Sequence, residues 1–236
     1  MLGSILRSLR AIIYGDGCIL CGGYVEEGMH SICNRCRFEI PLTNYQTKEE
    51  NPVKARFDGI VPVEQASALF FYMSGSSWQS YVHRFKSSGR WHLAYALGRW
   101  YGALLRESGL YDGVDVVVPV PLHPLKILKR GYNQSRYIAD GIAREMGLRV
   151  DARSVRRLRN NPSQARRSAS ARWENVESLF GVRSVEALRG RHILLVDDVL
   201  TTGATITSCI KAIQDAVPEC RVSVAVLSTT IRHEWL

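Results

Sequence analysis

Apolar residues along the second half of the chain alternate between short continuous runs and stretches with helical spacing. Residues 116–118 are all valine, which is typical of a strand buried on both faces. Over residues 134–146 the apolar positions recur near the helical period, and Gly147 follows as a helix stop. The series continues with a strand over 192–196, a helix over 203–216 and a strand over 222–227. This alternation predicts an α/β fold built on a parallel sheet.

The first half of the chain divides into three zones. Residues 1–43 carry four of the six cysteines and are predicted to form a small head. Residues 44–65 open with a polar stretch that contains Pro52 and lacks apolar periodicity, so they are predicted to form a connector. A strand over 66–72 and helical patterning over 78–85 and 91–105 then begin the main domain, predicted to span 66–236.

Composition places the chain among ordinary globular proteins. Of its 236 residues 46% are hydrophobic and 22% charged, which is enough apolar material for a real core and argues against disorder. The formal net charge of +9 and the pI near 9.4 favour polyanionic partners. Phosphorylated small molecules, nucleic acid and an anionic surface all satisfy this charge.

The chain shows no sequence signal for a membrane. Its apolar runs are far shorter than the ~20 residues that a membrane-spanning helix needs, so no membrane insertion is expected. The apolar cluster at residues 11–14 is also shorter than the core of a secretory signal. Two Cys-x-x-Cys pairs fit metal binding in a reducing compartment better than a disulfide framework. We therefore predict a cytoplasmic protein.

Residues 193–205 carry the strongest chemical signal. Four strand residues lead into two adjacent acids, Asp197 and Asp198, whose carboxylates can accept hydrogen bonds from the vicinal hydroxyls of a ribose. A threonine- and glycine-rich loop follows and opens a helix, where backbone N–H groups and the helix dipole favour a phosphate. The residues predicted to surround that phosphate are Val199, Leu200, Thr201, Thr202, Gly203, Ala204 and Thr205.

The plainer interpretation is a strand followed by a helix cap, in which Asp198 or Thr201 satisfies unpaired N–H groups. A cap explains one acid and one hydroxyl but not the whole arrangement. Adjacent aspartates repel one another, and a ligand or cation would offset that cost. We therefore interpret the segment as a pocket for a ribose 5-phosphate group.

A proline-rich segment with following cations ends the first strand. Prolines at 119, 121 and 124 fix the chain direction around Pro121, Leu122 and His123. Lys126, Lys129 and Arg130 follow and can neutralise a diphosphate. The alternative is a proline-rich connection with a solvated basic face. Asn133 and Gln134 then stand where they can cap the next helix or contact a substrate.

Residues 152–173 contain no acid and few apolar residues. They are predicted to form a mobile loop that closes over a phosphorylated substrate, although a solvated basic face remains an alternative. The loop's seven arginines are Arg153, Arg156, Arg157, Arg159, Arg166, Arg167 and Arg172.

The four cysteines of the head have the spacing of a zinc site. Cys18 and Cys21 form one Cys-x-x-Cys pair, Cys33 and Cys36 the other, and eleven residues separate the pairs. Two such pairs can hold one structural Zn²⁺ tetrahedrally, and zinc binding would then contribute to folding of so small a head. Redox motifs and reduced core thiols are the alternatives. Cys209 and Cys220, in apolar surroundings, are predicted to be packed thiols.

These motifs together resemble a known family. Residues 193–205 are similar to the phosphoribosyl diphosphate signature of type I phosphoribosyltransferases. Nearly the whole chain resembles the ComF family of competence-associated, phosphoribosyltransferase-like proteins with a zinc-binding head. Beyond the signature, the resemblance rests on Cys18, Cys21, Cys33 and Cys36 and on residues 85–90, 118–124, 130–134 and 161–164.

The resemblance implies a type I phosphoribosyltransferase-like parallel sheet flanked by helices, with an N-terminal four-cysteine zinc domain. It implies that 5-phosphoribosyl diphosphate binds with Mg²⁺ and that its phosphoribosyl group is transferred or released. Asp197 and Asp198 would then be the catalytic pair. The residues implied on the substrate side are Pro121, Leu122, His123, Arg130, Asn133, Gln134, Gln164 and Lys86.

The resemblance also implies a role in DNA uptake during natural transformation. The alternative function is a protein that handles single-stranded DNA beside other DNA-uptake proteins, with the pocket serving as a non-catalytic nucleotide sensor. No set of residues in the sequence selects an acceptor for the phosphoribosyl group.

Overall fold

The structure is a computed structural model that describes residues 17–26, 31–72, 91–159 and 179–230. The chain forms two compact units, Met1–Pro41 and Leu42–Leu236, which are described here one at a time. Residues 78–85, predicted to be helical, lie outside the described residues, as do Lys86 and Gln164.

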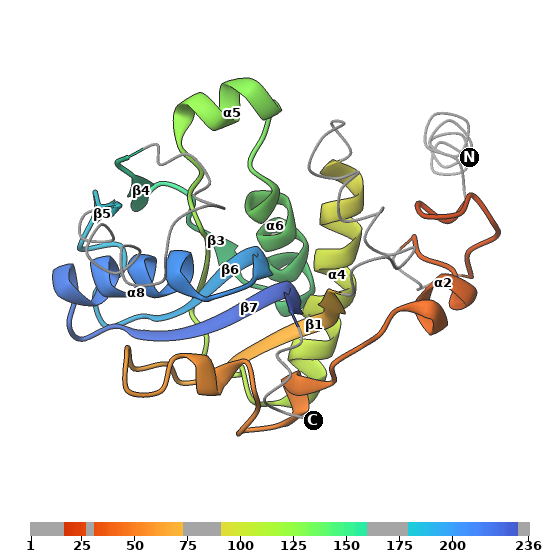
Figure 1. Ribbon diagram of the computed structural model, residues 1–236, viewed down its shortest axis with the longest axis horizontal. Helices are drawn as coiled ribbons and strands as arrows, with labels where there is room; N and C mark the ends of the chain where they lie inside the picture. The colour runs from red at the N-terminus through yellow and green to blue at the C-terminus, as the bar shows by residue number, and fades with distance from the viewer. Residues whose placement is uncertain (1–16, 27–30, 73–90, 160–178, 231–236) are drawn as a thin grey trace. The chain divides into compact units, whose positions relative to one another are not determined.

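A five-stranded parallel sheet forms the centre of the larger unit (Figure 1). Its strand order is β1-β7-β6-β2-β3, so the strand with the two aspartates stands in the middle of the sheet. The predicted parallel α/β fold is therefore confirmed. The strands are β1 (Ala66–Tyr72), β2 (Val116–Pro119), β3 (Arg149–Val150), β6 (His192–Leu200) and β7 (Arg221–Thr230).

Helices cover both faces of the sheet. On one face α8 (Ala204–Ala216) buries Ile206, Ile210 and Ile213 in the same apolar core as the sheet's valines and isoleucines. On the other face lie α4 (Trp91–Ser108) and α6 (Gln134–Met146), which pack closely against each other. Within the described part of the chain, no helix is both long and apolar enough to span a bilayer.

The sequence pattern located these elements, with differences at the sheet edge. The helix over 134–146 and its left-handed stop at Gly147, with φ of 69°, are as predicted. Strand β6 does not end at Val196, because its ladder with β7 continues through Asp197 and Val199 to Leu200. The proline-rich segment after β2 is not only a turn, since it opens α5 (Pro124–Arg130).

Residues 44–65 belong to the larger compact unit. They contain two short 3-10 helices, η1 (Tyr45–Thr47) and η2 (Lys54–Arg56). Val53 and Phe57 are buried in the core beside the sheet, and the Asn51 side chain binds the backbone of Ala66 at 2.9 Å. This stretch is therefore packed against the larger unit through buried residues, despite its polar composition.

The predicted arginine loop begins with regular structure. Strand β4 (Val155–Arg157) pairs antiparallel with β5 (Phe180–Val182), and Val155 and Phe180 are buried in the core. Arg156 and Arg157 thus lie on a strand rather than on an irregular loop, because the β5 partner supplies their ladder. Arg166, Arg167 and Arg172 lie outside the described residues.

Candidate functional site

The candidate site lies at the carboxyl edge of the sheet. Strands β2 and β6 are neighbours in the sheet, so Pro119 and Leu200, where they end, lie on the same edge. Helices α6 and α8 begin on this side, at Gln134 and Ala204. Loops at the carboxyl ends of parallel strands, followed by helix N-termini, form the usual ligand crevice of open α/β sheets.

Asp197 is held in place by two hydrogen bonds. Its Oδ1 accepts one from Ser135 Oγ at 2.8 Å and one from the backbone N–H of Asp198 at 2.9 Å. Ser135 belongs to the first turn of α6, so a helix that follows β2 in the chain orients an acid on the neighbouring strand β6. Asp198 follows directly on β6, and neighbouring strand residues point to opposite faces. Both aspartates are partly exposed, as a site for a polar ligand requires.

The loop after β6 has the features of a phosphate site. Gly203 adopts φ of 86°, a left-handed conformation that favours glycine, and α8 begins at the next residue. Thr201, Thr202 and Thr205 are exposed, and Thr202 Oγ1 accepts from the Ala204 N–H at 3.4 Å. No acid occupies the first turn of α8, so no side-chain charge there opposes an anion at the helix N-terminus.

The opposite side of the crevice is formed by residues from β2 to α6. Asn133 does not cap α6 with its side chain; instead its Nδ2 donates to the Val120 carbonyl at 3.0 Å and joins the end of β2 to the start of α6. Gln134 is buried, and its Oε1 accepts from Arg130 Nη1 at 3.5 Å. These hydrogen bonds are made within the protein, and contact of Asn133 and Gln134 with a substrate stays a prediction.

His123 caps α5. Its Nδ1 accepts the Leu125 N–H at 3.3 Å, and Pro124 supplies the first helical residue. Pro121 and Leu122 precede the cap and are half-buried. The proline-rich segment therefore ends in an N-cap, while contact of these three residues with a substrate stays a prediction.

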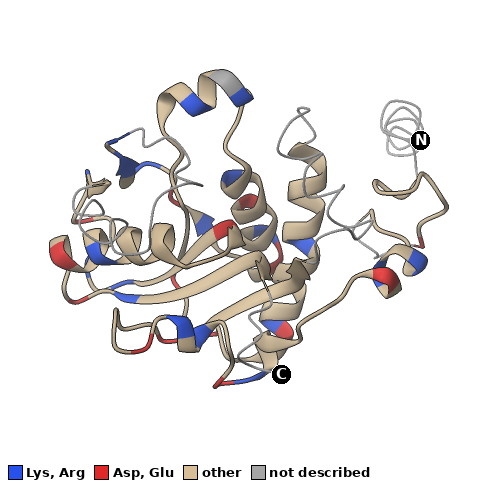
Figure 2. Ribbon diagram, viewed as in Figure 1, with Lys and Arg blue, Asp and Glu red and all other residues tan. Residues whose placement is uncertain are grey.

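Cations from α5 and β4 interact with one another, and one of them, Arg157, also interacts with Asp197. The pKa of Lys126 is lowered by burial and by the charges of Arg157 and Arg130. Burial also lowers the pKa of Arg157, whereas the negative charge of Asp197 raises it. The Arg157 guanidinium lies over the Phe180 ring, 5.3 Å from its centroid. Figure 2 shows the basic residues on α5 and β4, the two elements that carry this cluster.

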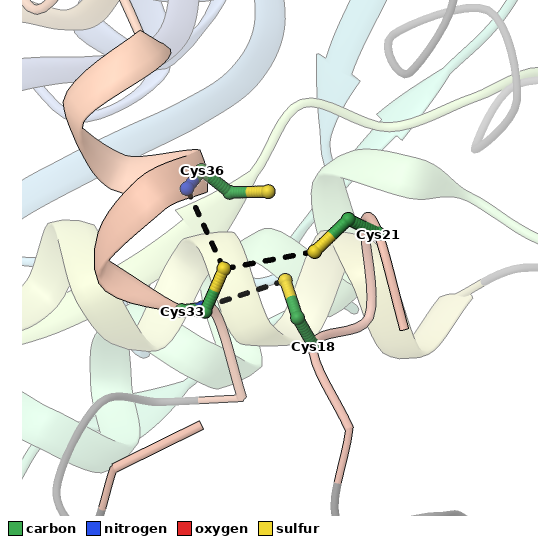
Figure 3. Close-up of side chains that lie close together, drawn as sticks. All are labelled: Cys18, Cys21, Cys33 and Cys36. Carbon is green, nitrogen blue, oxygen red and sulfur yellow. Dashed lines mark hydrogen bonds between the residues drawn. The ribbon is translucent and has the colours of Figure 1, made fainter. Parts of the chain in front are cut away.

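The smaller unit brings its four cysteines together, as predicted. The sulfur atoms of Cys18, Cys21, Cys33 and Cys36 all lie within 4.8 Å of one another, and the Cys21 and Cys33 sulfurs are 3.6 Å apart (Figure 3). Four thiolates about 2.3 Å from one zinc ion would stand about 3.8 Å apart. The cluster therefore has the donor type and spacing to hold a metal ion.

Backbone geometry of the head turns these sulfurs inward. The Cys33 N–H donates to Cys18 Sγ at 3.4 Å, and the Cys36 N–H, in the first turn of α2 (Asn34–Glu39), donates to Cys33 Sγ at 3.5 Å. Burial raises the pKa of Cys18, but hydrogen bonds from the Cys33, Cys21 and Leu20 backbone outweigh it and bring the pKa to about 7. Such donors stabilise a thiolate, the form that binds metals.

The two remaining cysteines are buried thiols, as predicted. Cys209 is fully buried on α8 and Cys220 lies just before β7. Burial raises the pKa of both, and the charge of Asp197 raises that of Cys209 further. Neither is therefore suited to act as a nucleophile.

Two residues that contact the site were not predicted from the sequence. Ser135 could have been found as a hydroxyl in the first turn of a helix that begins at the same sheet edge as Asp197. Arg56 donates to backbone carbonyls of Leu200 and Thr201, across more than half of the chain, and no local pattern predicts so distant a contact.

Comparisons with known proteins find similarity over the part of the chain that carries the candidate site. Residues 132–233 match the Phosphoribosyl transferase domain family, a range that includes Ser135, both aspartates and the loop before α8. Competence protein F of Haemophilus influenzae is 24% identical over 206 residues, which cover 84% of this chain and 90% of that protein.

DNA utilization protein YhgH of Escherichia coli strain K12 is 33% identical over 128 residues, 53% of this chain. The same protein from Salmonella typhimurium strain LT2 matches equally, and in each case the chain spans 56% of the relative's length. A solved structure described as the allosteric regulatory enzyme of purine biosynthesis aligns with 61% of this chain at 18% identity and a TM-score of 0.40.

The matched domain covers strand β6 with its two aspartates and the loop before α8, and the similarity to the Haemophilus protein extends over most of the chain. The phosphoribosyl transferase domain and the likeness to Competence protein F and to YhgH together support a ComF-family phosphoribosyltransferase-like protein.

Proposed function

We propose that the protein binds 5-phosphoribosyl diphosphate together with Mg²⁺ and transfers or releases its phosphoribosyl group. One observation carries the proposal: β6 presents Asp197 and Asp198 directly before a loop that opens α8 with a left-handed glycine. A diol-binding acidic pair next to a phosphate-binding loop is the arrangement that ribose 5-phosphate requires.

Three groups of residues would bind the three parts of 5-phosphoribosyl diphosphate: the ribose, the 5-phosphate and the diphosphate. Asp197, oriented by Ser135, and Asp198 would accept hydrogen bonds from the ribose hydroxyls. The loop N–H groups at the start of α8 would hold the 5-phosphate. Lys126, Arg130 and Arg157 would face the diphosphate and offset the charge that develops on it as the C1–O bond breaks.

Oxygen donors for a magnesium ion are present in the same place. The carboxylates of Asp197 and Asp198 are hard ligands of the kind Mg²⁺ prefers, and Mg²⁺ usually binds through one or two carboxylates together with substrate phosphates. When bound, the ion would neutralise negative charge on the diphosphate leaving group.

Calorimetric titration of 5-phosphoribosyl diphosphate with Mg²⁺ into the zinc-replete protein tests this proposal. Wild type should bind, and Asp197→Asn with Asp198→Asn should abolish binding. Asp112→Asn with Asp215→Asn removes two exposed acids away from the pocket and should bind like wild type. Absence of binding to folded wild type, or equal binding by the first double variant, would refute the proposal.

A second candidate function is handling of single-stranded DNA in natural transformation. It is supported by the cations on α5 and β4, the net charge of +9, and the relatives named for competence and DNA utilization. The affinity of the protein for single-stranded DNA should fall steeply with salt, because each neutralised phosphate releases counterions. In this case Asp197→Asn with Asp198→Asn should preserve or strengthen DNA binding, and absence of binding at low salt would reject it.

A further inference from the structure

We infer that Arg56 is a positioning residue for the phosphate loop, an inference that rests on the function proposed above. Arg56 ends η2, far from the loop in sequence. Its Nη1 donates to the Thr201 carbonyl at 2.6 Å and to the Leu200 carbonyl at 3.3 Å, and its Nη2 donates to the Thr230 carbonyl at 2.6 Å. One planar guanidinium thereby joins the ends of β6 and β7.

These bonds determine which way the loop's peptide groups face. In a trans peptide the C=O and the following N–H point in opposite directions. Fixing the carbonyls of Leu200 and Thr201 toward Arg56 therefore directs the N–H groups of Thr201 and Thr202 to the other side. A phosphate loop needs N–H groups directed at the anion and carbonyls satisfied behind it, and Arg56 supplies partners for those carbonyls.

The residue after Arg56 supports the same loop. Phe57 is buried, and its Cε1 lies 4.0 Å from the point where a Cβ on Gly203 would stand. Gly203 is thus backed by an aromatic ring while the two carbonyls before it are held by the neighbouring guanidinium. Residues 56 and 57 together form a platform under the loop, so the stretch predicted as a connector has a part in the site.

The geometry of the guanidinium, rather than its charge, is what this role requires. Arginine presents several donors in a fixed plane and can bind three carbonyls at once, whereas the flexible lysine ammonium cannot reproduce this fork. Removing the fork should misalign the loop N–H groups. A ligand whose phosphate binds this loop should then bind more weakly. A diphosphate that binds the cations of α5 and β4 should keep its affinity.

The test uses the full-length, zinc-replete protein with Arg56→Gln, Arg56→Lys and the control Lys54→Gln. Lys54 is also a cation of η2, but its ammonium binds Glu50 and the Glu49 carbonyl instead of the loop. Calorimetry would measure the affinity for ribose 5-phosphate and, separately, for magnesium pyrophosphate. Amide hydrogen exchange without ligand would report whether residues 201–205 are ordered.

Both Arg56 variants should weaken ribose 5-phosphate binding about tenfold and leave pyrophosphate binding unchanged, the size expected for lost hydrogen bonds to a charged donor. Their amides at 201–205 should exchange faster than those of wild type and of Lys54→Gln. Full ribose 5-phosphate affinity in Arg56→Lys would overturn the inference, because charge alone would then suffice. Equal losses for both ligands would also overturn it.

Failure of the proposed function would look different. If folded wild type bound neither ribose 5-phosphate nor pyrophosphate, the donor proposal would be wrong, and the exchange measurement would still decide the role of Arg56. Faster exchange at 201–205 in Arg56→Gln would then uphold its role in ordering the loop, and unchanged exchange would reject it.

Discussion

At the scale of single residues, the site depends on how Asp197 is oriented. Its Oδ1 accepts from Ser135 Oγ, a side chain that comes from a different strand connection. A hydroxyl that binds a carboxylate oxygen limits rotation of the acid, and under the proposed function it would keep Asp197 turned toward the ribose. The pair is therefore a set of three residues rather than two.

We expect Ser135→Ala to weaken donor binding severalfold, because a lost hydrogen bond to a charged group is worth about 1.5–3 kcal/mol and part of that loss falls on the ligand. Titration of 5-phosphoribosyl diphosphate with Mg²⁺ measures the effect. Ser108→Ala removes a comparable hydroxyl, bound to the Leu105 carbonyl at the far end of α4, and should leave affinity unchanged. Equal affinity in the two variants would show that Asp197 needs no such tie.

A second residue-scale prediction concerns His192, buried at the start of β6. Its Nε2 shares a hydrogen bond with Ser223 Oγ at 2.9 Å. Burial lowers the pKa of His192 and the charge of Arg221 lowers it further, although Glu64, the Gly113 backbone and Asp115 act against them. The folded protein therefore favours the neutral ring.

A lowered pKa in the folded state means that stability is complete above the usual histidine pKa of about 6.5 and is lost as the pH falls. Urea unfolding followed by tryptophan fluorescence at pH 7.5 and 5.5 should show this loss, because every tryptophan lies in the larger unit. The loss should be smaller in His192→Asn than in wild type or in His123→Asn. An equally steep loss in His192→Asn would assign it to other groups.

At the scale of elements, α4 and α6 approach each other through glycines. A Cβ at Gly98 would overlap the Ile138 carbonyl, one at Gly141 would overlap the Tyr95 carbonyl, and one at Gly102 would lie 2.8 Å from Ile142 Cα. The helices could not keep this separation with larger side chains. The contact holds the middle and end of α6, the helix whose first turn carries Ser135, against α4.

We therefore expect Gly98→Ala and Gly141→Ala to destabilise the larger unit by about 1–3 kcal/mol, the usual cost of overpacking, despite the gain of about 1 kcal/mol in helix propensity. Urea unfolding measures the change. Gly113→Ala, where a Cβ would come no nearer than 3.4 Å to another atom, is the control. A stabilised Gly98→Ala variant would mean that the helices can separate without loss.

The element scale also shows what the sequence could predict. The strands and helices of the sheet follow from runs of apolar residues. Residues 193–205 could be proposed as the pocket because the acids, hydroxyls and glycine are contiguous in sequence. The contacts of Arg56 with Leu200 and Thr201 were not predictable, since hydrogen bonds to backbone carbonyls leave no trace in side-chain pattern. Strand β4 was not predicted either, because it is short and rich in arginine and pairs with β5, which lies beyond the arginine-rich stretch.

At the scale of the whole molecule, the two compact units have different sources of stability. The larger unit buries a continuous apolar core around its sheet. In the described part of the smaller unit the buried apolar residues are Leu20, Ile32 and Ile40, which lie beside three buried cysteines of the four-cysteine cluster. A unit of this size has little apolar area to bury. We propose that Zn²⁺ held by the cluster stabilises the smaller unit and that the larger unit folds without it.

Removal of the metal should therefore affect one unit only. A chelator, or Cys18→Ser, should release about one zinc ion per chain by elemental analysis and make residues 17–41 sensitive to limited proteolysis, since structural zinc binding supplies folding free energy. Tryptophan fluorescence, which reports the larger unit alone, should give an unchanged urea midpoint. Cys220→Ser, outside the cluster, should retain its zinc. A midpoint that fell together with zinc release would show instead that the units unfold as one.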